Sequence, residues 1–66
     1  MQFFSCFTKD ARHETPTLWF IFAADLDRAR ELAKRELMED KGAIAVDICE
    51  ADGRLLWTEA AQVHPA

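Results

Sequence analysis

The sequence is short of the residues from which most small functional sites are built. Its 66 residues include two cysteines, two glycines, two histidines and one serine. Two cysteines are too few for a disulfide scaffold, so Cys6 and Cys49 are expected to be reduced thiols inside the cell. Gly42 and Gly53 stand apart, which excludes a glycine-rich phosphate loop. Cysteine and histidine also lack the clustered spacing of a zinc site. We therefore expect no metal and no other cofactor.

Long hydrophobic runs and an excess of positive charge are missing as well. The longest apolar run, residues 18–24, falls far short of the roughly 20 residues that a membrane-spanning helix needs. The first residues lack the basic stretch and cleavage site of a signal peptide, so we expect a cytoplasmic protein. The formal net charge is −4, which argues against direct nucleic-acid binding because phosphate affinity depends on clustered cations.

Candidate catalytic groups are few and lack partners in the sequence. Ser5 is the only serine, His13 lies in a charged segment beside Glu14, and His64 is close to the end of the sequence. Nucleophilic or acid–base catalysis needs a second group that activates the first. No such pair is recognisable, and we expect a protein that is not an enzyme.

The first third of the sequence predicts a β-hairpin. Residues 1–8 are rich in aromatic side chains and contain no glycine, proline or charged residue. This composition favours a strand. Residues 9–16 are polar and end in Thr15-Pro16, which favours a loop. Residues 17–23 are β-branched and aromatic at nearly every position, and are expected to pair antiparallel with the first strand.

A helix is predicted next. Asp25 is suited to be the N-cap of this helix, and Lys41 and Gly42 are suited to its C-terminal end. The helix is therefore expected to have about 16 residues. One apolar stripe runs along it at three- and four-residue spacing: Leu26, Ala29, Leu32, Ala33 and Leu37. The stripe is expected to lie on a sheet.

The last third predicts a second hairpin. Residues 43–50 alternate in hydrophobicity, Asp52-Gly53 is a strong turn signal, and residues 54–59 return as a strand. The fold class is therefore α+β, in the order ββαββ: a four-stranded antiparallel sheet with one helix packed on one face. Residues 1–66 make a single small domain, with residues 62–66 as a frayed tail.

The register of the second hairpin is left open by the sequence. A two-residue turn pairs Ile48 with Trp57 and places both on the helix side. A three-residue turn with a left-handed Gly53 pairs Ile48 with Leu56 and turns Trp57 outward. The second form also sets Glu50 opposite Arg54, and is favoured for that reason.

Aromatic side chains are expected on both faces of the first hairpin. Alternation puts Phe3 and Phe7 on one side of their strand and Phe4 on the other, and separates Trp19 from Phe20 in the same way. One short helix covers one face only, so the other face should expose an apolar patch, which usually marks an interaction surface. Either a homodimer or a tight complex with another protein is expected to cover it, and Trp19 and Phe20 are candidate contacts.

The second half of the chain carries most of the acid. Residues 36–66 contain seven acidic and two basic side chains, whereas residues 1–35 are close to neutral. The candidate partner-binding carboxylates are Glu36, Glu39, Asp40, Asp47, Glu50, Asp52 and Glu59. Alternation is expected to place Asp47 on the open face of the sheet and the other hairpin acids at its rim. A surface of this kind would dock on a cationic groove.

The layout resembles a known class of inhibitors. The aromatic N-terminal hairpin, the Ala-Ala-Asp-Leu-Asp-Arg-Ala-Arg-Glu-Leu-Ala-Lys helix and the acidic hairpin of residues 42–57 are similar in architecture to small phage and mobile-element anti-CRISPR proteins. The resemblance implies a non-enzymatic protein that binds a CRISPR effector complex. It would act by mimicking nucleic-acid charge or by blocking a conformational step.

A different class remains open. The spacing of Leu26, Ala29 and Ala33 resembles a helix common in HicB-type antitoxins, although the proline-rich turn that usually precedes that helix is absent. This resemblance implies an antitoxin-like or adaptor domain that dimerises through the open face of its sheet.

Overall fold

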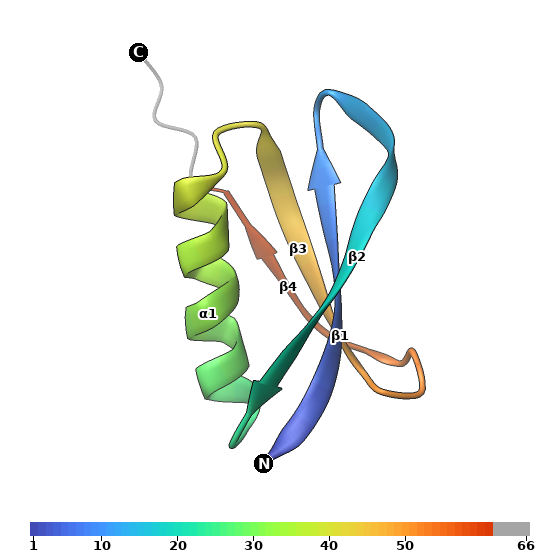
Figure 1. Ribbon diagram of the computed structural model, residues 1–66, viewed down its shortest axis with the longest axis vertical. Coiled ribbons are helices and arrows are strands. Elements are labelled where there is room, and N and C mark those ends of the chain that lie inside the picture. Colours follow the sequence, from blue (N-terminus) through green and yellow to red (C-terminus); the bar gives the residue numbers. More distant parts are fainter. Residues whose placement is uncertain (62–66) are drawn as a thin grey trace.

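A four-stranded antiparallel sheet and one helix make up residues 1–61 (Figure 1). The computed structural model describes these residues, and the tail predicted over residues 62–66 lies outside them. Along the chain the elements are β1 (Gln2–Asp10), β2 (His13–Ala23), α1 (Leu26–Glu39), β3 (Ala43–Glu50) and β4 (Leu55–Ala60). The strand order in the sheet is β2-β1-β3-β4. The predicted ββαββ fold of the α+β class is confirmed.

The first hairpin is longer than the sequence indicated, and the loop predicted over residues 9–16 is wrong. β1 continues to Asp10, and a two-residue turn leads directly into β2. Pro16, which suggested a loop, lies within β2 at the edge of the sheet, beside a register shift between Thr8 and Asp10. Proline lacks an N–H and is tolerated at edges and irregularities because no ladder bond is lost there.

The helix begins where predicted but ends earlier. Asp25 is the N-cap, and its carboxylate accepts a hydrogen bond from a backbone N–H of the first turn. α1 has 14 residues, because Asp40 caps its C-terminus in an extended conformation and Gly42 does not. Within residues 1–61 only Gly53 has a positive φ. Gly42 instead lies next to the guanidinium of Arg12, a flexible side chain that would have to shift to make room for a Cβ at this position.

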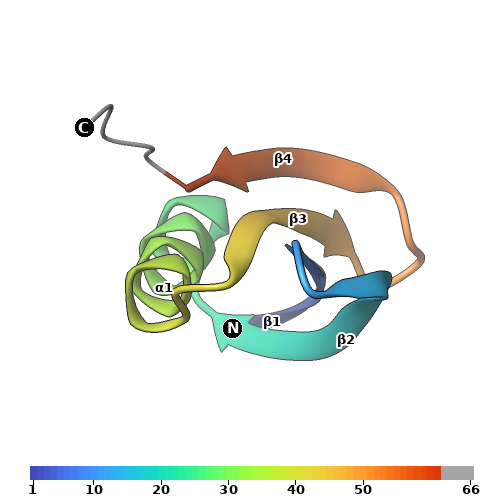
Figure 2. The ribbon, with the colours of Figure 1, turned by 90° about the horizontal axis from the view of Figure 1, so that it is seen from above.

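The buried core lies between α1 and one face of the sheet (Figure 2). Ala29, Ala33 and Leu37 are buried on the helix, and Leu26 and Leu32 pack partly buried beside them, so the predicted apolar stripe is confirmed. The sheet contributes seven further buried side chains: Phe4, Cys6, Ile21, Ala23, Ala43, Val46 and Ile48. Since α1 is the only described element outside the sheet, the opposite face is left without a covering layer.

A three-residue turn closes the second hairpin, as the sequence favoured. Gly53 has a φ of 97°, a left-handed conformation that glycine adopts without strain. The N–H of Glu50 donates to the carbonyl of Arg54 at 2.8 Å, and the N–H of Gly53 donates to the carbonyl of Glu50 at 2.8 Å. The Arg54 guanidinium lies 2.6 Å from the Glu50 carboxylate. The expected position of Glu50 opposite Arg54 is confirmed.

The outward orientation expected for Trp57 is wrong. A bulge next to Ile48 shifts the register, so that Ile48 faces Trp57 and both lie on the helix side. The Arg30 guanidinium sits 3.9 Å from the centre of the Trp57 ring, and its Nε donates to Glu59 Oε1 at 2.9 Å. Leu56 packs against the core. Contacts with the helix thus favour the bulged register over the regular one.

Leu37 and Met38 provide a matched test of the helix packing. Leu37 is buried, whereas its neighbour Met38 is 84% exposed. We expect Leu37→Ala to lower the free energy of unfolding by about 2–5 kcal/mol, because apolar contacts are lost and a cavity remains. Met38→Ala should change it by less than about 0.5 kcal/mol. Urea unfolding followed by circular dichroism, at one fixed protein concentration, measures both. Equal losses would contradict the packing described here.

Candidate interaction surface

The sheet face that turns away from α1 presents large apolar side chains to water. The register of β1 and β2 sets Phe3 beside Phe22, and Phe7 beside Leu18. We call this surface the open face and define it by Phe3, Phe7, Leu18, Phe20, Phe22 and Leu55. Five of these side chains are more than half exposed: Phe3 59%, Leu18 52%, Phe20 63%, Phe22 53% and Leu55 58%. The apolar patch that the alternation predicted is present.

The side chains of the open face differ in size between the edge strands and the central strands. One row of residues runs across all four strands in the order Phe20, Ser5, Cys49, Leu55. The two central members are small and buried, and the two outer members are large and exposed. In the neighbouring row the rings of Phe3 and Phe22 lie 4.6 Å apart. In the first row, large exposed side chains on the two edge strands therefore flank small buried ones on the central strands.

The charged side chains of β1 and β3 on this face neutralise each other. Lys9 Nζ lies 3.4 Å from Asp47 Oδ2. Thr58 Oγ1 donates to Asp47 Oδ1 at 2.8 Å. Asp47 lies on the open face, as predicted, but it is bound to a cation and a hydroxyl. The open face is thus apolar and close to neutral.

The acidic residues expected to form a binding surface are dispersed over the molecule. Four of the seven are in ion pairs, namely Asp40 with Arg12, Asp47 with Lys9, Glu50 with Arg54, and Glu59 with Arg30. Within residues 1–61 the other three form no ion pair: Glu36 and Glu39 are exposed on α1, and Asp52 is exposed in the β3–β4 turn. The structure does not bring these carboxylates together into one acidic surface.

Glu59 departs furthest from its expected place at the rim. It is buried on the helix side of β4, where it accepts the hydrogen bond from Arg30. A buried carboxylate with a cationic partner holds two elements together, and removal of one partner leaves the other charge unpaired. Glu59 is therefore part of the contact between β4 and α1.

The two aromatic candidates lie on opposite faces of the sheet. Trp19 is half-buried on the helix side, and its Nε1 donates to Thr8 Oγ1 at 2.7 Å. Phe20 is on the open face. Of the pair, Phe20 is the one available to a partner.

The thiols and the described histidine sit in ordinary surroundings. Burial, with a smaller effect of Cys49, raises the pKa of Cys6 to about 11. Burial and the nearby Asp47 also raise the pKa of Cys49. A raised pKa keeps a thiol in its unreactive protonated form. His13 is exposed, with Nδ1 3.9 Å from Asp10. In the part of the chain that the structure describes, no three potential metal ligands gather, and no helix is long and apolar enough to cross a membrane.

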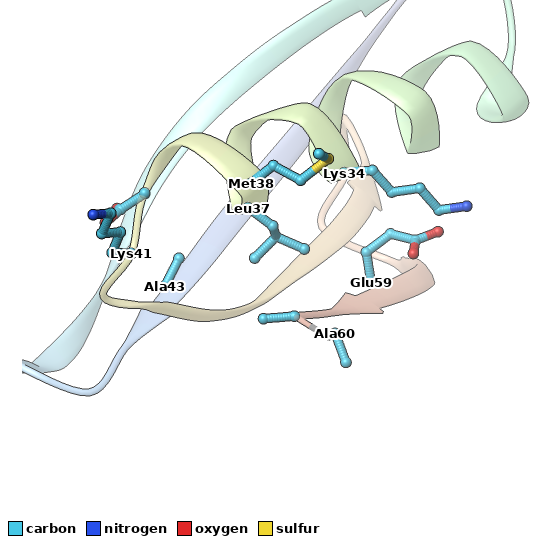
Figure 3. A pocket seen from close by; sticks show the side chains of 9 residues that line it. Lys34, Leu37, Met38, Lys41, Ala43, Glu59 and Ala60 are labelled. Atoms are coloured by element: carbon cyan, nitrogen blue, oxygen red, sulfur yellow. The ribbon is translucent and has the colours of Figure 1, made fainter. Parts of the chain in front are cut away.

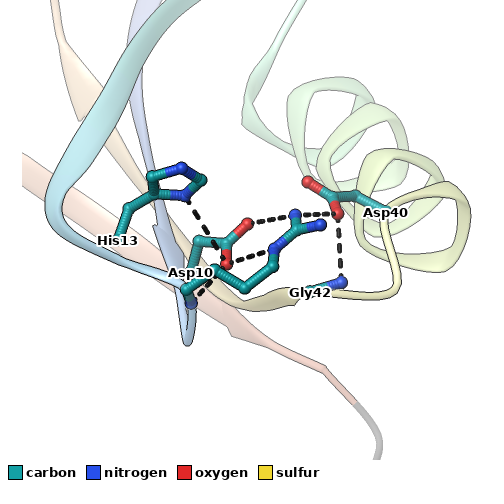
Figure 4. A network of polar contacts seen from close by, with 5 residues as sticks. Asp10, His13, Asp40 and Gly42 are labelled. Atoms are coloured by element: carbon teal, nitrogen blue, oxygen red, sulfur yellow. Dashed lines mark hydrogen bonds and ion pairs between the residues drawn. The ribbon is translucent and has the colours of Figure 1, made fainter.

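A polar cluster at the end of the first hairpin was not predicted from the sequence (Figure 4). Arg12 binds the Asp10 carboxylate through Nε at 2.9 Å and Nη2 at 2.6 Å. The same Nη2 donates to Asp40 Oδ1 at 3.0 Å, and that oxygen accepts from the N–H of Gly42 at 3.1 Å. The cluster ties the β1–β2 turn to the end of α1. Its only sequence signal is the Asp-x-Arg spacing of a tight turn.

Arg12 also controls the ionisation of Asp10. The Asp10 side chain is 8% exposed. Hydrogen bonds from the Arg12 side chain and backbone, together with its charge, hold the pKa of Asp10 well below its usual range. The same carboxylate raises the pKa of Arg12. Asp10 is therefore ionised beside Arg12 at neutral pH.

An open hollow of about 500 Å³ lies between the end of α1 and β4, next to the polar cluster, with which it shares Asp40 (Figure 3). Leu37, Met38 and Ala60 form apolar parts of its wall, and Lys34 and Lys41 lie at its border. Glu59 also lines it, but this carboxylate is bound to Arg30. Its lining gathers no pair of groups suited to acid–base or nucleophilic chemistry.

Comparison with family models, with curated proteins and with solved structures found no match to this chain.

Asp10 gives a pH-dependent test of the polar cluster. Its folded pKa is lowered, so its contribution to stability is complete above the unfolded value of about 3.9 and is lost as the pH falls through the folded value. We expect Asp10→Asn to lower stability by a constant amount from neutral pH down to about pH 5, and the difference from wild type to shrink below about pH 4. Urea unfolding at several pH values measures this difference.

Glu36→Gln is the matched control for Asp10→Asn. Glu36 is exposed and has no ion-pair partner within residues 1–61, so its substitution should leave stability nearly unchanged at every pH. A difference for Asp10→Asn that does not vary with pH would show that the Arg12 contact contributes nothing through charge.

Proposed function

We propose that this chain is a non-enzymatic protein-binding domain and that the open face is its binding surface. One observation carries the proposal: three phenylalanines and two leucines on a single sheet face are more than half exposed. Monomeric proteins in water rarely leave a contiguous apolar patch of this kind uncovered, and such patches mark interaction sites. Aromatic side chains are also the residues that contribute most at protein interfaces.

The charges of the open face favour a protein partner over a nucleic acid. Lys9, its cation, is already paired with Asp47. Nucleic-acid affinity comes from several unpaired cations that release counterions from phosphate. A neutral surface with exposed phenylalanines matches instead the apolar centre of a protein interface.

The more specific form of the proposal is an inhibitor of a CRISPR effector complex, as the architectural resemblance implies. The distribution of acid supports a particular mode of action. Four of the seven candidate carboxylates are ion-paired within the domain, which weakens any imitation of a phosphate backbone. Such an inhibitor would occupy a surface of the effector protein through the open face, and so prevent nucleic-acid binding or a conformational step. The alternative, an antitoxin-like or adaptor domain, would use the same face to dimerise.

Purified CRISPR effector complexes test the specific proposal. We expect the wild-type protein to reduce target-DNA binding or cleavage by at least one effector. Phe20→Asp places a charge in the most exposed phenylalanine position of the open face and should abolish inhibition. Met38→Asp makes the same kind of change at an exposed apolar residue on the other side of the molecule, and should leave inhibition unchanged.

A second arm tests the acidic surface separately. Reversal of Glu59 would set a lysine against Arg30 and damage the fold, so the unpaired and exposed acids are the suitable targets. A triple variant, Glu36→Lys, Glu39→Lys and Asp52→Lys, should inhibit like wild type. Loss of inhibition in this variant alone, with Phe20→Asp still active, would contradict the open face as the binding surface. Failure of the wild-type protein against all effectors would contradict the CRISPR-specific form.

A further inference from the structure

We propose that in the free protein a second copy of the chain covers the open face, in a symmetric dimer whose two sheets pack face to face. The proposal rests on the proposed function, because it names the occupant of the same binding surface. Three properties of the face support a copy of itself as that occupant: its area, its charge and its shape.

The area is suited to a dimer of two small domains. At about 200 Å² per phenylalanine, Phe3, Phe20 and Phe22 alone expose roughly 350 Å². The whole face spans about 19 Å across four strands and about 26 Å along eight residues. These dimensions enclose roughly 490 Å², so two copies would bury about 1,000 Å² together, which is the lower limit for a specific interface. The area therefore suits a weak dimer.

The charge of the face permits two copies to meet. The chain as a whole carries −4, which opposes association of two identical molecules. On the open face, however, Lys9 and Asp47 cancel each other. Face-to-face packing would bury two neutralised pairs, and would leave exposed acids such as Glu36 and Glu39 on the outer, helical side of each copy. Charges there are separated by two domains and screened by salt.

The shape of the face is suited to its own copy. In a twofold contact, residue i of one copy meets residue j of the other and the reverse contact is equal. The open face combines large exposed rings, Phe20 and Phe22, on an edge strand with small side chains, Ser5 and Cys49, on the central strands. Packed sheets lie about 10 Å apart with interdigitated side chains. In a twofold contact the large side chains of one copy can therefore pack over the small central residues of the other.

Such a dimer would regulate the proposed function. The surface that binds another protein would be covered until the two copies separate. A partner would then compete with self-association, and its apparent affinity would fall as the concentration of the protein rises.

Sedimentation equilibrium at micromolar concentrations tests the dimer. We expect the wild-type chain to have twice its monomer mass of 7.6 kDa. Phe20→Asp should weaken the dimer by at least about 30-fold and give the monomer mass. Met38→Asp, with its change on the helical side, should remain a dimer. Circular dichroism checks that each variant is folded, and Leu55→Asp on the opposite edge of the open face replaces Phe20→Asp if the latter is not.

A charge swap gives a test that keeps every apolar side chain. Lys9→Glu sets two carboxylates together on each copy and should weaken the dimer by at least about 10-fold. Adding Asp47→Lys restores neutrality and should restore the dimer. Because the swap also restores the ion pair within each copy, circular dichroism has to show that Lys9→Glu is folded before its loss of mass is assigned to the dimer.

The outcomes separate the dimer from the proposed function. A wild-type monomer throughout the micromolar range overturns the dimer. If inhibition of a partner is still lost in Phe20→Asp, the proposed function stands without it. A wild-type monomer with no effect of Phe20→Asp on any partner overturns both. A dimer that persists in folded Phe20→Asp and Leu55→Asp, or that is lost equally in Met38→Asp, also overturns the inference, because the interface then lies elsewhere.

Discussion

One helix of 14 residues has to stabilise a sheet of four strands, and it reaches only one face. At 1.5 Å per residue α1 is about 21 Å long, similar to β4 at roughly 20 Å but shorter than β1, β2 and β3 at roughly 26–36 Å. Its buried residues include Ala29 and Ala33, whose small side chains let the helix lie close to Phe4 and Ile48. The core is thin as a result, and all of it lies on this side. The apolar character of the opposite face follows from the same shortage of covering elements.

Charged side chains hold the edges of this arrangement. Arg30 contacts both Trp57 and Glu59 and keeps the edge strand β4 on the helix. At the opposite end, Arg12 links the β1–β2 turn to Asp40 at the C-terminus of α1. Several carboxylates of an acidic chain are thereby used inside the fold. This is why the acid in the second half of the sequence does not become one acidic surface, and why the open face stands out as the candidate binding site.

Local patterns predicted the elements of the fold and failed where a neighbour in space decided the outcome. Alternation identified the strands, and the apolar spacing identified the helix face. Pro16 suggested a loop because the sequence does not show that its strand lies at the sheet edge, where a missing N–H costs little. Gly42 suggested a helix cap, whereas Asp40, held by Arg12 of the β1–β2 turn, is the residue that caps the helix. The position of Trp57 depended on a bulge that is favoured by contacts with Arg30, 27 residues away in the chain.

The sequence by itself determined the order of elements, the faces of β1, β2 and β3 on which their large side chains lie, and the presence of an uncovered apolar face. These follow from periodicity and from the number of helices, which are properties of consecutive residues. Only the tertiary structure decided which acidic residues are free. Ion pairs such as Glu59 with Arg30, or Asp40 with Arg12, join residues 28 or 29 positions apart, and no local pattern encodes them. The tertiary structure also decided that Phe20 is exposed whereas Trp19 is half-buried and hydrogen-bonded, because burial depends on what packs above a side chain.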